Sequence, residues 1–162
     1  MDTQDSSAVQ TEPRWLNPQE QRVWRLHLEV SKLLAYQLER DLQPHGLTLN
    51  DYEILVNLSE APDRRMRMSD LARATLQSKS RLSHQITRME NAGLVRRENC
   101  ESDRRGLYTV LSDHGWETMR KVAPYHVASV RRHFIDRMSP ERLADLQEAL
   151  TPVAEHLRGV RL

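Results

Sequence analysis

The sequence has little of what secreted and membrane proteins require. Its 162 residues include one cysteine, five glycines and one phenylalanine, and aromatic residues make up only 5%. A single cysteine excludes an intrachain disulfide framework. No apolar run approaches the roughly 20 residues of a membrane-spanning helix, and the polar N-terminus lacks the apolar segment of a secretion signal. We therefore expect a cytoplasmic protein with no membrane partner.

Catalytic and metal-binding patterns are also missing. The chain has no glycine-rich phosphate loop, no nucleophile elbow and no paired-carboxylate motif, so we expect no enzyme activity and no cofactor. Seven histidines are present, but no two of them stand four residues apart, and there is no Cys-x-x-Cys pair. We expect no bound metal.

Charged residues and helix formers are abundant instead. Charged residues make up 29% and hydrophobic residues 38% of the chain, which favours amphipathic helices with wide solvent-facing sides. The net charge of +1 is unevenly distributed, because residues 64–105 contain eleven Lys or Arg but only five Asp or Glu. A basic middle between acidic flanks is typical of a polyanion-binding segment. Charge alone fits a solvated basic surface equally well.

Hydrophobic periodicity predicts a mainly helical chain. A helix of roughly 25 residues begins at Pro18 and is stopped by Pro44 and Gly46. A second begins at Asn50 as N-cap, with Glu53 in the capping-box position. Further helices are expected from Ser69 or Asp70, from Ser78 to Asn91, from Ser112 or Asp113 to about Met138 with a kink or break at Pro124, and from Ser139 onward.

Two alternating segments predict a β-hairpin. LVRRE (94–98) and LYTVL (107–111) read as paired strands, and NCESDRRGL (99–107) reads as the tip between them. A helix, a tight turn, a second helix and a hairpin in this order form a winged helix-turn-helix. The fold class is therefore mainly α with a small β-hairpin wing.

The helix that begins near Ser78 has two contrasting faces. Leu82, Ile86 and Met89 share one face and are predicted to pack into the core. The other face carries cations, hydroxyls and one amide but no carboxylate, which suits the major groove because an acid there would meet phosphates and base acceptors. Its candidate DNA-contacting residues are Ser78, Lys79, Ser80, Arg81, His84, Gln85 and Arg88.

Side-chain chemistry suggests a role for each of these residues. Arg81 and Arg88 can reach guanine or a phosphate. Gln85 can pair with adenine, and His84 can donate to a base or to the backbone. The two serines and the lysine at the helix start suit phosphate contacts.

These motifs together resemble the MarR family of bacterial transcription regulators. The resemblance is carried by SDLARATLQSKSRLSHQITRMENAGLVRR, by ESDRRGLYTVLSDHGW, by the Asp-x-Arg wing tip and by the Leu-Ser-x-x-Gly turn. It implies a homodimeric, double-stranded-DNA-binding protein, mostly a repressor, often released by small aromatic or phenolic compounds. It also implies that Arg105 enters the minor groove and that Asp103 orients the two tip arginines, Arg104 and Arg105. This agrees with the attraction of arginine to a narrow minor groove.

The flanking helices suggest how two copies associate. Leucine and valine recur at three- and four-residue spacing over residues 143–157, and such a seam must bury against another surface. A two-fold dimer would bind a pseudo-palindromic operator. The expected organisation is an N-terminal tail (1–17), a helical dimerisation region (18–46 and 112–158) and a DNA-binding lobe (47–111).

Two other interpretations stay open at this point. A winged-helix protein-interaction module without DNA binding would carry acids on the recognition face, and none is there. A redox-gated regulator could act through Cys100, whose neighbours include both arginines that favour a thiolate and acids that oppose it. No ligand-pocket residue can be assigned from the sequence.

Overall fold

The computed structural model describes residues 13–100 and 103–160, and for Cys100 and residues 103–105 it describes the backbone only. Two compact units make up the chain, residues 1–33 and 34–162, and their boundary falls within the first helix. None of the described helices is both long and apolar enough to cross a membrane. The elements are α1 (Pro18–Leu42), α2 (Leu49–Glu60), β1 (Arg65–Arg67), α3 (Met68–Ala74), α4 (Lys79–Asn91), β2 (Val95–Cys100), β3 (Asp103–Leu111), α5 (Asp113–His133) and α6 (Pro140–Gly159), with short 3-10 helices at Gln43–His45, Pro62–Arg64 and Ile135–Arg137.

Side-chain caps explain where most helices begin. Asn17 precedes α1, and its Oδ1 accepts hydrogen bonds from the backbone N–H groups of Gln19 and Glu20. Ser78, Ser112 and Ser139 cap α4, α5 and α6 through their hydroxyl oxygens, as expected for Ser78 and Ser139, and Ser112 is the cap of α5 where the sequence allowed Ser112 or Asp113. The predicted extent of the first helix is also confirmed.

Two predicted helix starts are wrong. The cap of α2 is Thr48, not Asn50, because the Thr48 hydroxyl and the Asp51 carboxylate each accept the other residue's backbone N–H, at 3.1 and 2.9 Å. Glu53 therefore lies outside the capping box. Helix α3 begins at Met68 without a side-chain cap, ahead of Ser69 and Asp70, because Arg67 ends a short strand immediately before it.

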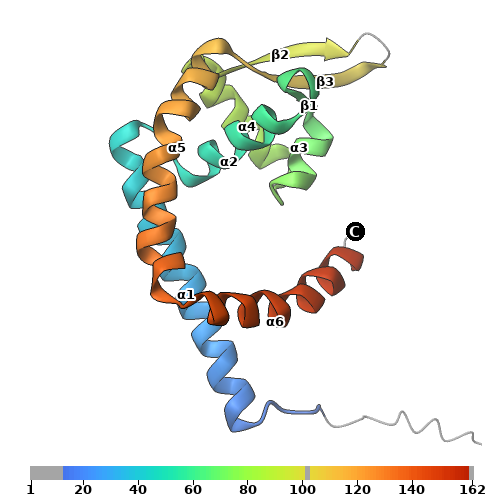
Figure 1. Ribbon diagram of the computed structural model, residues 1–162. Coiled ribbons are helices and arrows are strands. Elements are labelled where there is room, and N and C mark those ends of the chain that lie inside the picture. Colours follow the sequence, from blue (N-terminus) through green and yellow to red (C-terminus); the bar gives the residue numbers. More distant parts are fainter. Residues whose placement is uncertain (1–12, 101–102, 161–162) are drawn as a thin grey trace, which may run out of the picture. The chain divides into compact units, whose positions relative to one another are not determined.

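That short strand, β1, was not predicted. It pairs antiparallel with β3, which also pairs antiparallel with β2, so the sheet order is β1-β3-β2. Three residues are too few for alternation to be visible in a sequence. The hairpin of β2 and β3 projects from the helices of its unit (Figure 1), and its strands extend further toward the tip than predicted, with Asp103, Arg104 and Arg105 in β3.

The core lies among α2, α3, α4, the sheet and α5. Its fully buried side chains include Leu55, Leu58 and Leu71, together with the three predicted core residues of α4, Leu82, Ile86 and Met89. Thr109 is a buried polar residue of β3, and its hydroxyl donates to the sulfur of Met68 at 2.9 Å. The sheet and α3 are thus joined below the wing.

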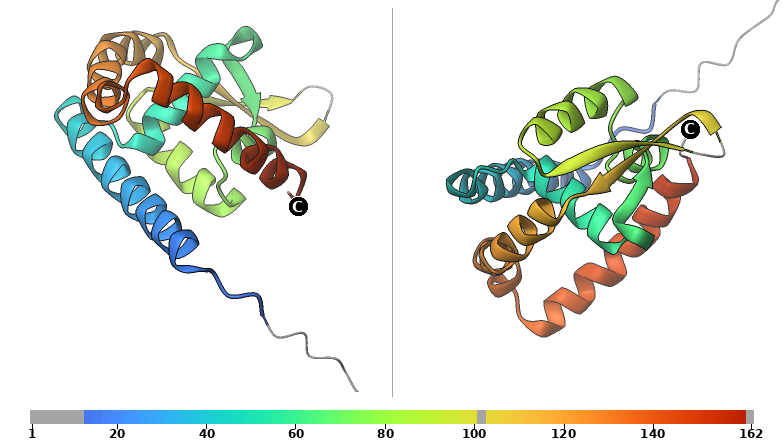
Figure 2. Two further views of the ribbon diagram at one scale, coloured as in Figure 1. Left: turned by 60° about the horizontal axis from the view of Figure 1, so that its bottom comes forward. Right: turned by 90° about the horizontal axis from the view of Figure 1, so that it is seen from above.

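The C-terminal helices differ from the prediction in one respect. Helix α5 continues through Pro124 and ends at His133, after which a 3-10 turn leads into α6, which runs crosswise to α5 (Figure 2). The expected end near Met138 is therefore too late. Helix α6 has no buried residue, and its predicted seam is open to solvent, with Leu150, Val153 and Leu157 exposed by 46, 52 and 59%.

Gly115 lies where the backbone of α5 passes very close to the start of β2. A Cβ atom at this position would stand 2.0 Å from the carbonyl oxygen of Leu94 and 2.8 Å from the Leu111 side chain. No side chain larger than hydrogen fits there without moving the backbone.

We expect Gly115→Ala to lower the free energy of unfolding by about 3 kcal/mol, because the obstructing atom belongs to the backbone and cannot rotate away. Urea denaturation followed by circular dichroism would measure the change. Gly159→Ala is the matched control, since a Cβ there meets nothing within 4 Å, and it should leave stability within about 0.5 kcal/mol of wild type. Equal effects of both substitutions would contradict the close approach.

Candidate DNA-binding surface

Helix α4 is fixed at both ends and along one side. The Ser78 hydroxyl oxygen accepts the backbone N–H of Arg81 at 3.2 Å. At the other end Gly93 has φ +72°, and the N–H of Leu94 donates to the carbonyl oxygen of Met89 at 3.0 Å, which closes the helix. Because its apolar face is buried, its opposite face has a defined orientation.

The N-terminal half of that opposite face is open. Lys79, Ser80, Arg81 and His84 are exposed. Within the described part of the chain, Lys79, Arg81 and His84 have no ion pair or side-chain hydrogen bond. These three side chains can therefore meet an anion without first breaking an internal contact.

Gln85 and Arg88, one and two turns along, are held by an acid from another helix. The Oδ1 atom of Asp51 accepts a hydrogen bond from Gln85 Nε2 at 3.1 Å and from Arg88 Nη2 at 2.5 Å. Asp51 is fully buried and also closes the capping box of α2. One carboxylate thus connects the start of α2 to the recognition helix.

The environment keeps Asp51 ionised. Burial alone raises the pKa of its carboxyl group, but hydrogen bonds from Arg88, from Thr48 and from Gln85 outweigh it and hold the pKa below the usual value of an aspartate. The absence of acids on α4 therefore does not make this surface free of acids. Arg88 keeps 55% of its side chain exposed, so its guanidinium can bind Asp51 and still face solvent.

An open cleft of about 530 Å³ lies between the start of α2 and α4. Glu39 stands at its edge, and its Oε2 accepts the backbone N–H of Leu49 at 2.6 Å. The cleft is lined by Glu39, Thr48, Asn50, Arg81, His84, Gln85 and Arg88. Four of the seven predicted major-groove residues therefore converge on one concave surface.

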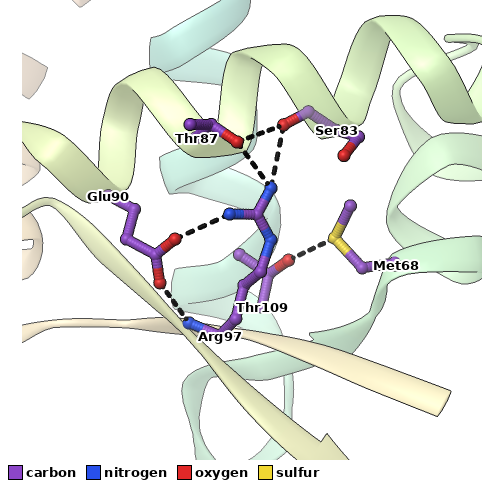
Figure 3. A network of polar contacts seen from close by, with 6 residues as sticks. All are labelled: Met68, Ser83, Thr87, Glu90, Arg97 and Thr109. Carbon is purple, nitrogen blue, oxygen red and sulfur yellow. Dashed lines mark hydrogen bonds and ion pairs between the residues drawn. The ribbon is translucent and has the colours of Figure 1, made fainter. Parts of the chain in front are cut away.

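Arg97 links the wing to the recognition helix. Its guanidinium donates to the Glu90 carboxylate at 2.6 Å, to the Ser83 carbonyl oxygen at 2.9 Å and to the Thr87 hydroxyl at 3.0 Å. Its backbone N–H also donates to Glu90 at 2.9 Å, so strand and helix are joined twice (Figure 3). Arg97 is a structural residue, and its charge is not available to a ligand.

Other arginines of the basic segment also have partners within the protein. Arg96 pairs with Glu98 at 2.7 Å on β2. The Arg64 guanidinium lies 4.1 Å from the ring centroid of Trp116, and that of Arg65 lies 5.1 Å from the ring of Tyr108. The count of positive charges in residues 64–105 thus overstates the charge available to a polyanion.

The wing tip is described in its backbone only. Cys100 ends β2 and pairs with Asp103 at the start of β3, with an irregularity in register between Asn99 and Cys100. The side chains of Cys100, Asp103, Arg104 and Arg105 lie outside the described residues, so their roles remain predictions. Both arginines nevertheless occupy strand positions beside the tip.

The histidines that could suggest a metal site have other roles here. The His126 ring packs against the Tyr52 ring at an interplanar angle of 39°, with 4.3 Å between the centroids, and burial lowers the pKa of His126. The ring nitrogen Nε2 of His133 lies 3.2 Å from Asp41, which also accepts the Ser129 hydroxyl at 2.6 Å. Among the described residues, no three His, Cys, Asp or Glu side chains form a metal-binding group.

Comparison with known proteins identifies the family. A model of the MarR family matches residues 45–106, the part that holds α2, α3, α4, β2 and the beginning of β3. The crystal structure of AbsC, a MarR family transcriptional regulator from Streptomyces coelicolor, is 75% identical, with a TM-score of 0.86, and the match covers 91% of this chain and 99% of AbsC. The chain belongs to the MarR family.

Two further relatives extend this comparison. Sco3205, a MarR family transcriptional regulator from Streptomyces coelicolor solved in complex with DNA, is 46% identical with a TM-score of 0.86, and the match covers 91% of this chain and 92% of that one. The transcriptional regulator HosA of Escherichia coli is 30% identical over 95 residues, which are 59% of this chain and 68% of HosA. The predicted family and winged helix-turn-helix fold are confirmed.

Sequence reasoning missed Asp51, Glu90 and Arg97. A signal for Asp51 was present, because Thr48-x-x-Asp51 is itself a capping box. The contacts to Gln85 and Arg88 span 34 and 37 residues, and no local pattern reports a contact of that range.

We expect Asp51→Asn to destabilise the protein by about 2 kcal/mol at neutral pH, because two charge-assisted contacts of a buried carboxylate are lost. The pKa of Asp51 is lowered by folding, so its contribution is present above the unfolded pKa and is lost as pH falls through the folded one. The difference between variant and wild type should therefore shrink as the pH falls below the ordinary pKa of an aspartate side chain.

Urea unfolding across a pH series would measure this difference. Asp145→Asn is the matched control, because Asp145 is an exposed residue of α6, and it should change stability little at any pH. A gap between Asp51→Asn and wild type that stays constant down to the lowest pH would contradict the ionised state of Asp51.

Proposed function

We propose that this DNA-binding transcriptional regulator acts as a homodimeric repressor at a pseudo-palindromic operator. Helix α4 enters the major groove with Ser78, Lys79, Ser80, Arg81 and His84 leading, and the wing places Arg105 in the minor groove with Arg104 and Asp103 beside it. The observation that carries the proposal is the open basic half of α4 on a helix whose other side is fully buried.

The contacts of Gln85 and Arg88 with Asp51 refine the roles of these two residues in the helix. Gln85 and Arg88 are oriented by a buried acceptor, so each is presented in a fixed direction and loses little side-chain freedom on binding DNA. Gln85 keeps its amide oxygen for a base donor, and Arg88 keeps part of its guanidinium in solvent. The complex of Sco3205 with DNA supports a DNA partner for a fold of this type.

The homodimer rests on apolar surface that the single chain leaves exposed. In α6 the exposed large apolar side chains are Leu150, Val153 and Leu157. Helix α1 exposes its own apolar side chains, among them Val23, Trp24 and Leu33. Helices of this kind bury such faces against a partner, and a two-fold pair of recognition helices addresses major grooves about 34–36 Å apart.

The proposal includes regulation by a small molecule. On the family resemblance, a small aromatic or phenolic compound releases the protein from DNA, and the protein acts in the cytoplasm on the nucleoid. The redox-gated alternative through Cys100 gains no support from the described residues, and neither does the protein-interaction module.

Selection of random double-stranded DNA by the purified protein, followed by sequencing, tests the proposal directly. We expect a palindromic consensus with half-sites one helical turn apart. An absence of enrichment over random DNA would contradict sequence-specific binding, whereas enrichment of a single non-repeated site would contradict the two-fold dimer.

On the selected operator, Arg81→Ala should weaken binding by about 1–3 kcal/mol. Loss of a phosphate contact would reduce the salt dependence of binding by about one contact, whereas loss of a base contact would relax specificity at about one base pair. The matched control is Arg120→Ala in α5, which removes the same charge from an exposed pair with Glu117. Fluorescence anisotropy at several salt concentrations measures both. Equal losses for the two variants would indicate a net-charge effect and contradict the placement of Arg81 in the groove.

Val153→Asp should shift the dimer toward monomer, because a charge would be buried in the α6 seam. The matched control is Thr151→Asp, which adds the same carboxylate off the seam and should leave the dimer intact. Analytical ultracentrifugation over a dilution series reports the mass. A dimer that survives Val153→Asp unchanged would exclude this seam from the interface.

A further inference from the structure

Leu76 has an unusual conformation in the turn between α3 and α4. Its φ is +55°, in a region that glycine adopts freely and that other residues adopt at a steric cost. Its side chain is also 73% exposed. Glycine or asparagine would form the same turn with less strain and no exposed apolar surface.

Two other non-glycine residues share this backbone region, and their side chains interact within the protein. Asp63 (φ 53°) pairs with Arg65 at 3.5 Å, and the Arg64 (φ 52°) guanidinium lies over the Trp116 ring. Leu76 instead keeps most of its side chain in solvent. Its neighbour Thr75 turns inward, is buried, and donates its hydroxyl to the Leu71 carbonyl oxygen at 2.8 Å.

The position of Leu76 relates it to the DNA-binding surface. Within the described residues of the DNA-binding lobe, the exposed large hydrophobic side chains are Leu76 and Leu107. Leu76 precedes the cap residue Ser78 by two positions, so their Cα atoms lie within about 8 Å of each other. An apolar side chain therefore stands beside the open polar end of α4.

The major groove offers one apolar group to such a side chain, the C5 methyl of thymine. We propose that Leu76 is a specificity-determining residue whose side chain packs against a thymine methyl at the edge of the half-site. The strained turn positions an exposed leucine for this contact. This inference rests on the proposed entry of α4 into the major groove.

Replacement of thymine by uracil tests the contact at the level of single atoms. Each symmetry-related pair of thymines in the selected operator is replaced by deoxyuridine, which removes the methyl and keeps every hydrogen-bonding group. At one thymine position, wild-type affinity should fall about fourfold per methyl, the factor for one buried methyl group. Leu76→Asn should bind the thymine operator more weakly and should not distinguish thymine from uracil there.

Two controls separate this role from a structural one. Leu76→Asn keeps a residue that tolerates positive φ, so its thermal midpoint should equal or exceed that of wild type, and Leu76→Gly provides a second such variant. Arg81→Ala should bind weakly yet keep the discrimination between thymine and uracil at the Leu76 position.

Several results would overturn the inference. Unchanged affinity of both folded Leu76 variants would exclude any contact with DNA. Weaker binding with an unchanged uracil pattern would place Leu76 against the sugar-phosphate backbone and contradict the methyl contact. Wild-type protein that enriches no operator would instead contradict the proposed function, so the two failures are distinguishable.

Discussion

The buried carboxylate of Asp51 is the interaction on which the DNA-binding surface depends. It caps the N-terminus of α2 together with Thr48, and at the same time it accepts hydrogen bonds from Gln85 and Arg88 of α4. A buried charge is tolerated only when its hydrogen-bonding capacity is satisfied, and here two helices share in satisfying it. The orientation of α4 relative to α2 is therefore tied to an electrostatic requirement as well as to apolar packing.

A charged side chain with several hydrogen-bond partners also fixes the position of the wing. Arg97 brings β2 to α4 by satisfying Glu90, the Ser83 carbonyl group and Thr87 together. Hydrophobic packing is non-directional and leaves some freedom to slide, whereas a guanidinium with several fixed acceptors defines one register. In the proposed complex, helix and wing contact adjacent grooves of one duplex, so a fixed spacing between them would serve DNA binding.

Local patterns predicted much of this molecule. The caps Ser78 and Ser139 and the apolar face of α4 each depend on residues within about four positions, and all were predicted correctly. The three-residue strand β1 and the clamp on Asp51 depend on partners more than thirty residues away. The prediction for α4 did not include the Asp51 contacts of Gln85 and Arg88, because an acid from α2 could not be seen on the sequence of α4.

The joint around Ser112 has a mechanical consequence. Its hydroxyl lies within hydrogen-bonding distance of the carbonyl oxygens of Gly93 and Leu94, at 2.6 and 2.9 Å, and accepts the N–H of Gly115. The backbone at Gly115 also lies directly against the carbonyl oxygen of Leu94. The end of the recognition helix and the beginning of α5 therefore cannot move independently. A tilt of the far end of α5 would therefore rotate the recognition helix α4, because these contacts leave no hinge between the two helices.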